Sequence, residues 1–214
     1  MSQLKIAVAG GPGSGKSTFV HLLTVALGDE RYVNPPLPDG MVAEYARTFI
    51  DRRIRQERLP GGGLRQINVY DQLLILNGQR RRENDLAEYP VVISDSPTFL
   101  QYVYFFEADP LQDTIGEETR TLIRRELERA AIEAIGRYDI IFFLPPVVPF
   151  RSDPTRWQSG AQERKRISDR IEGFLRFGGA RYVTLRKKAR RERVHEALGH
   201  LKPFLEKTHM ERST

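Results

Sequence analysis

The chain has 214 residues, 40% of them hydrophobic and 29% charged, which predicts one folded domain over residues 1–214 and excludes a disordered chain. It contains no cysteine, which excludes disulfides, thiol nucleophiles and thiolate metal sites and favours a reducing compartment. The net charge is +6, no apolar run approaches the roughly 20 residues of a membrane span, and the first residues lack the layout of a signal peptide, so we expect a cytoplasmic protein without membrane contact.

Apolar runs, helical periods and Gly/Pro breaks divide the chain into alternating strands and helices. In chain order we expect a strand over Leu4–Ala9, a helix over Lys16–Leu27, a strand over Met41–Ala43, a helix from Tyr45 to about Arg58, a helix over about Leu64–Glu83, a strand over Val91–Ser94, a helix over about Glu117–Arg137, a strand over Asp139–Leu144, a helix through Ile167 and Leu175 that ends at Gly178, a strand over Ala180–Leu185, and a helix from about Ala189 that breaks around Gly199–Pro203. The strands are continuous apolar runs, as in sheets that are covered on both faces. The predicted fold class is therefore α/β, with three layers and a mainly parallel sheet of about five strands.

Ligands of such a sheet bind at the carboxyl ends of its strands. The segments that follow the predicted strands at this edge are Gly10–Ser17, Glu44, Asp95 and Pro145–Arg151. The sequence therefore places the candidate site among these four segments.

The first of these segments, GGPGSGKS over residues 10–17, matches the phosphate-loop pattern G-x-x-x-x-G-K-[ST]. Its glycines let backbone N–H groups turn towards phosphates, and the helix that opens at Lys16 adds its positive end. Lys16 is expected to reach the β- and γ-phosphates of ATP, and Ser17 to offer its hydroxyl to Mg²⁺. The predicted ATP-binding residues are Gly11, Pro12, Gly13, Ser14, Gly15, Lys16, Ser17 and Thr18.

A phosphate loop by itself does not distinguish a switch, a motor and a kinase. No N-K-x-D sequence for guanine recognition occurs, and the chain is short for a ring motor with an extra helical lid. A small kinase remains, with a P-loop NTPase fold and a helical lid over about residues 147–166.

Two carboxylates suit such a kinase. Asp95 ends a buried strand, where P-loop enzymes hold Mg²⁺; the simpler alternative is a helix N-cap. Glu44 lies at a strand-to-helix junction, where it would accept the proton of an attacking hydroxyl; the alternative is a first-turn Glu that the helix dipole stabilises. Arg47 would pair with Glu44 or with substrate phosphate.

The basic excess lies in one segment, residues 151–193, with 14 Lys and Arg against 5 Asp and Glu, whereas residues 1–150 hold 17 against 20. Such a segment suits a polyanion. Within the lid, Arg156 and Arg164 would neutralise the transferring phosphoryl group, and Arg151 would contact substrate. The alternatives are a solvated basic helix face and a compositional bias, since the chain has 27 arginines and 7 lysines.

The order of these motifs resembles a known family. G-G-P-G-S-G-K-S-T, E-Y-A-R, a glutamine-containing helix, D-S-P-T, Y-D-I-I-F-F-L-P-P and D-P-T-R follow one another between about Lys5 and Arg193. This arrangement resembles the ribosylnicotinamide-kinase-like and deoxynucleoside-kinase-like branch of small P-loop kinases. The branch includes phage-encoded kinases of 5-hydroxymethyluracil in DNA, which this chain is similar to in size.

The resemblance implies an ATP- and Mg²⁺-dependent kinase acting on a hydroxyl of a nucleoside-like acceptor. With the basic segment, it favours 5-hydroxymethyluracil in DNA as acceptor, and the host cytoplasm as location for a phage-encoded enzyme. One alternative is a small-molecule nucleoside, nucleotide or nicotinamide riboside kinase, and another is a non-catalytic ATP-binding or DNA-binding module. The sequence leaves a monomer and a dimer equally open.

Overall fold

A computed structural model of the chain describes residues 3–28, 39–42, 44–50, 52, 67–107, 115–147 and 160–212. Within these residues there are five strands, β1 (Leu4–Ala9), β2 (Asp39–Val42), β3 (Val91–Asp95), β4 (Ile140–Phe143) and β5 (Tyr182–Thr184). They form one sheet in the order β2-β3-β1-β4-β5, with every neighbouring pair parallel. The predicted α/β fold with a parallel sheet of about five strands is confirmed.

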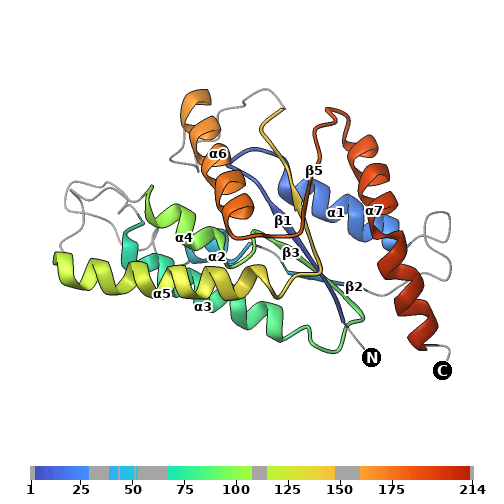
Figure 1. The fold of residues 1–214 in the computed structure, drawn as a ribbon, viewed down its shortest axis with the longest axis horizontal. Helices are drawn as coiled ribbons and strands as arrows, with labels where there is room; N and C mark the ends of the chain where they lie inside the picture. Colours follow the sequence, from blue (N-terminus) through green and yellow to red (C-terminus); the bar gives the residue numbers. More distant parts are fainter. Residues whose placement is uncertain are drawn as a thin grey trace.

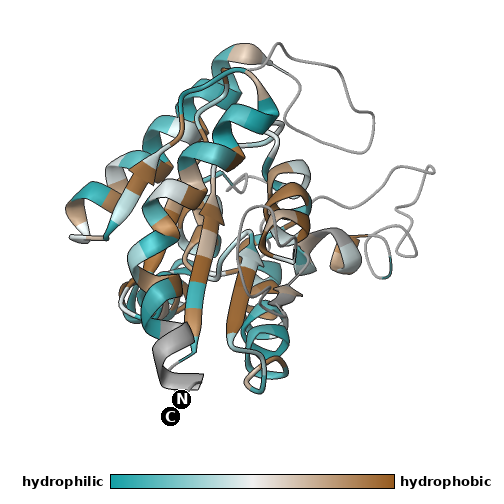
Figure 2. Cartoon of the chain, turned by 90° about the vertical axis from the view of Figure 1, so that its right-hand side faces the viewer, coloured by the Kyte–Doolittle hydropathy of each residue, from teal (hydrophilic) through white to brown (hydrophobic). Residues whose placement is uncertain are grey.

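The sheet is the middle of three layers (Figure 1). Helices α1 (Lys16–Leu27) and α7 (Arg190–Arg212) cover one face, and α4 (Leu100–Phe105), α5 (Glu117–Ile135) and α6 (Ala161–Phe177) pack on the other. Along β1, Ile6 and Val8 join the core under α1 and α7, whereas Ala7 and Ala9 join the core under α4 to α6. Both faces of the strand are therefore buried, which explains the continuous apolar strands visible in Figure 2.

Two more helices lie beside the edge strand β2. These are α2 (Tyr45–Phe49) and α3 (Val69–Asn84), and α3 packs against α4 and α5. Helix α3 begins where Asn68 and Asp71 form a capping box, each side chain accepting from the other residue's backbone N–H at 2.9 Å.

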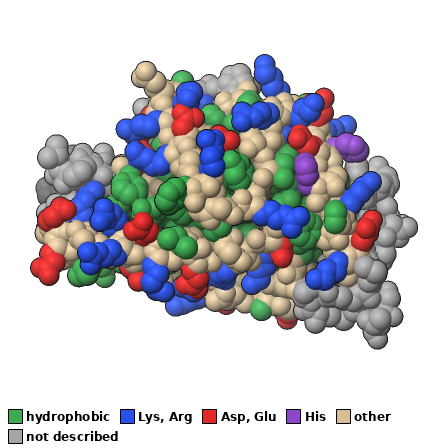
Figure 3. Space-filling view, in the orientation of Figure 1, with side chains coloured by type: hydrophobic (Ala, Val, Ile, Leu, Met, Phe, Trp, Pro, Cys, Tyr) green, Lys and Arg blue, Asp and Glu red, His purple; other side chains and the backbone are tan. Residues whose placement is uncertain are grey.

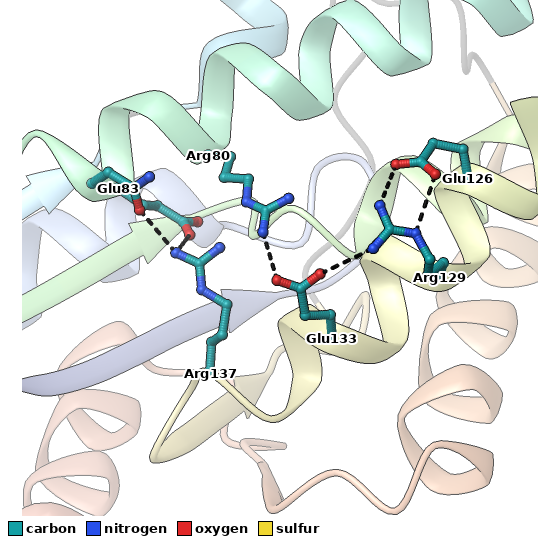
Figure 4. Close-up of polar contacts among 7 residues, drawn as sticks. Arg80, Glu83, Glu126, Arg129, Glu133 and Arg137 are labelled. Carbon is teal, nitrogen blue, oxygen red and sulfur yellow. Dashed lines mark hydrogen bonds and ion pairs between the residues drawn. The ribbon is translucent and has the colours of Figure 1, made fainter.

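Ion pairs tie α3 to α5 on the surface (Figure 4). Arg80 of α3 lies 2.5 Å from Glu133, which also lies 3.7 Å from Arg129, and Arg129 bonds Glu126. Such exposed pairs each contribute about 0–1 kcal/mol. The helix contact therefore depends mainly on the apolar cluster beneath them, which includes Leu76 and Leu127.

The structure corrects the last helix. A break was expected around Gly199–Pro203, but α7 continues through both residues to Arg212. A proline inside a helix costs about 3 kcal/mol, because it lacks an N–H and clashes with the carbonyl four residues earlier. The leucines 198, 201 and 205 are buried on the sheet, and burial of each contributes roughly 1.5–3 kcal/mol. Their combined burial outweighs the cost of Pro203.

Other helix boundaries differ less. The short helix α4 was not predicted, and α3 starts at Val69, within the expected Leu64–Glu83. Of the helix expected from Tyr45 to about Arg58, the structure shows α2 over Tyr45–Phe49, and residues 51 and 53–66 lie outside the described residues. No helix within the described residues is long and apolar enough to cross a membrane.

Candidate active site

The phosphate loop follows β1 and leads into α1, as predicted. At Gly10 an added Cβ would lie 2.5 Å from the carbonyl oxygen of Leu144, which directly follows the adjacent strand β4, so only glycine fits there. Gly15 is the N-cap of α1 with φ 90°, a left-handed conformation that suits glycine. It provides no side-chain cap, so the first N–H groups of α1 have no capping side chain and are suited to an anion.

Lys16 stands at the head of this helix. Its side chain is 9% exposed, and Nζ donates to the carbonyls of Gly10 at 3.0 Å and Gly11 at 3.2 Å. The ammonium group is therefore held inside the curve of the loop. Ser17 and Thr18, which come next on α1, are exposed.

Two buried arginines hold the loop from the outside. Arg164 of α6 donates from Nε to the carbonyl of Pro12 at 2.8 Å and from Nη2 to that of Gly13 at 3.0 Å. Arg193 of α7 donates from Nη1 to the carbonyl of Ser14 at 3.2 Å and from Nε to that of Lys187 at 2.5 Å. Both side chains are 3% exposed, and burial lowers the pKa of Arg193.

Arg164 was expected in a lid over the transferring phosphoryl group, but its side chain packs against the phosphate loop. Its guanidinium lies on the loop backbone, and α6 approaches so closely that a Cβ on Gly11 would lie 3.2 Å from the Arg164 carbonyl. Its contact with the transferring phosphoryl group stays a prediction. Arg151, Arg156 and lid residues 148–159 lie outside the described residues, and of Arg47 only the backbone, in α2, is described.

The two candidate carboxylates follow adjacent strands. Asp95 is the last residue of β3, is 4% exposed and pairs in register with Val8 of β1. Glu44 comes two residues after Val42, which pairs with Ser94. The strand order β2-β3-β1 thus brings Glu44, Asp95 and the phosphate loop to one edge of the sheet. Ser96, directly after Asp95, has φ 64° and turns the chain sharply there.

A buried polar cluster that the sequence did not predict lies behind Asp95. Glu83 of α3 accepts from Ser94 at 2.7 Å and from the Tyr138 hydroxyl at 2.8 Å. Its carboxylate also lies 3.8 Å from Arg137 (Figure 4). Burial raises the pKa of Glu83, although both hydrogen bonds and Arg137 act in the opposite direction. Burial, followed by the charge of Glu83, raises the pKa of Tyr138 well above its ordinary value.

Comparison with known proteins assigns the fold to a family. The family described as AAA domain matches residues 5–193. The chain belongs to this AAA-domain family. No curated protein matches the chain by sequence. As an AAA domain, the chain carries its phosphate loop and both candidate carboxylates within the matched region.

Solved structures share this fold at low identity. A NadR protein in complex with NR has 18% identity and a TM-score of 0.67 over 95% of this AAA domain and 52% of its own chain. A NadR protein with NAD and AMP-PNP has 16% identity and a TM-score of 0.63, over 95% and 49%. This AAA domain thus spans about half the length of the NadR chains. Deoxyadenosine kinase from M. mycoides with bound dATP has 12% identity and a TM-score of 0.63, over 93% and 100%.

The residues present fit ATP and Mg²⁺. The loop offers a bare backbone at Gly10 and an uncapped helix start at Gly15 for phosphate oxygens. The Ser17 hydroxyl and the Asp95 carboxylate are hard oxygen ligands of the kind that Mg²⁺ prefers. No cluster of three or more His, Cys, Asp or Glu that could hold a metal occurs in the described part of the chain.

Proposed function

We propose that this AAA domain is an ATP-dependent kinase that phosphorylates a hydroxyl group of a nucleoside-like acceptor. The observation that carries the proposal is the meeting of three groups at one sheet edge: the phosphate loop after β1, Asp95 at the end of β3, and Glu44 after β2. A nucleotide-binding switch needs the loop and a metal ligand, but a second carboxylate on the next strand suits the activation of an acceptor hydroxyl.

The transfer then needs one bond formed and one broken. The acceptor oxygen bonds to the γ-phosphorus, the bond from that phosphorus to the β–γ bridging oxygen breaks, and ADP leaves with that electron pair. Glu44 accepts the proton of the hydroxyl, and Lys16 stabilises charge on the β- and γ-phosphates. Ser17 and Asp95 would hold Mg²⁺, which when bound would supply positive charge to the same phosphates.

The arginines fill supporting roles in this proposal. Arg156 and Arg164 neutralise the transferring phosphoryl group, and Arg164, which lies 2.8 Å from the Pro12 carbonyl, also fixes the phosphate loop. Arg47 and Arg151 bind the substrate.

Two acceptors fit the proposal. The first is 5-hydroxymethyluracil in DNA, which the exposed cations of the β5–α7 turn and the start of α7 favour: Lys187, Lys188, Arg190 and Arg191. Figure 3 shows several Lys and Arg side chains on the upper part of one face, mixed with acidic ones. On α6, part of the basic charge is already neutralised, since Arg166 and Arg170 pair with Glu107 and Lys165 pairs with Asp169.

The second acceptor is a free nucleoside. The fold is shared with a deoxyadenosine kinase that spans the same length and with NadR proteins, which favours this acceptor. It requires no contact between the β5–α7 turn and a polyanion.

One experiment separates these outcomes. The protein is incubated with γ-labelled ATP and, in parallel, with free nucleosides, nicotinamide riboside, ordinary DNA and DNA containing 5-hydroxymethyluracil. Label in none of them, with ATP binding intact, contradicts the kinase proposal and leaves a non-catalytic ATP-binding module.

The salt dependence of acceptor binding gives a second test. With about four phosphate contacts, a fourfold rise in salt weakens DNA binding roughly 50- to 150-fold. Lys187→Glu with Lys188→Glu would weaken it as well, and ATP hydrolysis would be unaffected. Flat salt dependence with label on a free nucleoside assigns the small acceptor.

A further inference from the structure

We infer that Gln79 is a positioning residue that sets Glu44 against the end of β3, and so determines where the acceptor hydroxyl loses its proton. The inference deepens the proposed function and rests on it. The deciding feature is one buried amide that bonds both to the backbone beside Glu44 and to the backbone of Asp95.

The contacts of Gln79 leave its amide a single orientation. Its Oε1 accepts from the Tyr45 backbone N–H at 2.8 Å, and its Nε2 donates to the Ser94 hydroxyl at 3.2 Å and to the Asp95 carbonyl at 3.4 Å. A backbone N–H only donates and a carbonyl only accepts, so the reversed amide would lose both outer bonds. The side chain is 1% exposed, so water offers no ready replacement.

The neighbouring Ser94 completes the arrangement. Its hydroxyl donates to Glu83 at 2.7 Å and therefore accepts from Gln79. Each hydrogen in the chain from Tyr45 to Glu83 thus has one direction. The network carries no proton to or from Glu44, and its role is to hold the backbone in place.

Gly78, next to Gln79 in α3, also helps to fix Tyr45 against this helix. At Gly78, in the middle of α3, an added Cβ would lie 2.2–2.5 Å from atoms of the Tyr45 ring. The ring fills the space that a side chain would take, and the Arg82 guanidinium covers it at 4.9 Å from the centroid. Arg82 also donates to the Thr48 hydroxyl at 3.1 Å, so α2 is fixed to α3 along its length.

The attachment of α2 to α3 stabilises a part of the site that has little secondary structure of its own. Among the described residues, β2 is an edge strand of four residues that pairs with β3 alone, and Glu44 lies beyond its end. The α-helical part of α2, which follows, is described over five residues, and short helices take most of their stability from packing. Because a displacement of about 1 Å in a reacting group can cost roughly 10²-fold in rate, a second anchor at Tyr45 has a catalytic value.

The first test replaces the amide with a side chain of similar shape. Gln79→Met should lower kcat for acceptor phosphorylation by roughly 10- to 100-fold, with KM for ATP unchanged. Asn77→Met, an exposed position on the same helix, is the control and should leave kcat unchanged. Full kcat in Gln79→Met would overturn the inference.

A double variant separates positioning from simple stability. If Gln79 acts through Glu44, then Gln79→Met should cost almost nothing in kcat once Glu44→Gln is present. A purely structural role predicts the same factor of loss in both backgrounds, and that result would refute the inference.

A third measurement is independent of activity. The Tyr45 amide belongs to the first turn of α2, where no helical acceptor exists, so its protection from hydrogen exchange depends on Gln79. Gln79→Met should raise its exchange rate by about two- to tenfold, while amides of α1 stay unchanged. Equal Tyr45 exchange in the two proteins would contradict the inference. A wild type that protects Tyr45 but labels no acceptor refutes only the kinase proposal.

Discussion

The two sides of the site are held by different chemistry. On the nucleotide side, the ammonium of Lys16 and the guanidiniums of Arg164 and Arg193 donate to carbonyls of the phosphate loop. On the acceptor side, the neutral amide of Gln79 joins Tyr45 to β3.

This difference follows from what each side must hold. Cations that shape the phosphate loop also favour the binding of phosphate, so the same groups serve both structure and binding. On the other side, the uncharged amide of Gln79 binds backbone groups of Tyr45 and Asp95, while the Arg82 guanidinium packs on the Tyr45 ring and donates to the Thr48 hydroxyl.

Lys16→Ala, on the nucleotide side of the site, should cause the largest loss of phosphoryl transfer. It removes the charge that is proposed to stabilise the β- and γ-phosphates, and phosphoryl transfer should fall by at least about 10²–10³-fold. Lys202→Ala, an exposed lysine on α7, is the matched control. Turnover measured with γ-labelled ATP checks the prediction, and wild-type turnover in Lys16→Ala would contradict the role of the loop.

Glu44→Gln should impair the acceptor reaction without affecting the binding of ATP. The amide cannot accept the hydroxyl proton, so kcat should fall by roughly 10²–10⁴-fold while ATP affinity stays nearly unchanged. Asp95→Asn should instead weaken the binding of Mg²⁺ on which activity depends, because an amide is a poorer ligand for a hard cation. Titration of ATP and Mg²⁺ separates the two, and an equal loss of ATP affinity in both variants would contradict separate roles.

Arg193→Met tests whether this buried arginine fixes the phosphate loop on the nucleotide side. It leaves the buried carbonyl of Ser14 without this donor, which should lower the free energy of unfolding by about 1–3 kcal/mol. ATP affinity should fall too, because the loop is less fixed. Arg191→Met changes an exposed arginine on the same helix and should affect neither quantity. Denaturant unfolding and ATP titration of both variants are the measurements.

Glu83→Gln has the smallest expected effect and depends on pH. Burial raises the folded pKa of Glu83 above its ordinary value of 4.5, so the fold favours the protonated carboxyl. The wild type therefore loses stability from this group as pH rises from about 4.5 to the folded pKa, and none further above it. Glu83→Gln keeps an acceptor for Ser94 and Tyr138 and should lack this decline.

Denaturant unfolding at several pH values checks this prediction. Glu126 is the control of opposite sign, because its hydrogen bond with Arg129 lowers its pKa, so its contribution is lost as pH falls. A wild type and a Glu83→Gln variant with the same pH dependence would contradict the role of burial.

The sequence determined the phosphate loop and the sheet. Glycines at fixed spacing before Lys16, and apolar runs that end in Gly, Asp or Pro, are local signals, because backbone conformation and burial of a short strand depend on neighbouring residues. The positions of Glu44 and Asp95 at strand ends followed from the same pattern, and the strand order confirms that they share an edge.

The tertiary structure alone decided the contacts between distant segments. Arg164 is 152 residues from Pro12 and Arg193 is 179 from Ser14. The sequence singled out Arg164 as a lid arginine, but it did not indicate that either side chain binds the backbone of the phosphate loop. Gly78 was the one available signal, because a glycine inside a helical pattern indicates close packing, but it did not name Tyr45 as the partner. Pro203 shows the same limit, since its local preference to end a helix was overruled by leucines whose burial depends on the whole core.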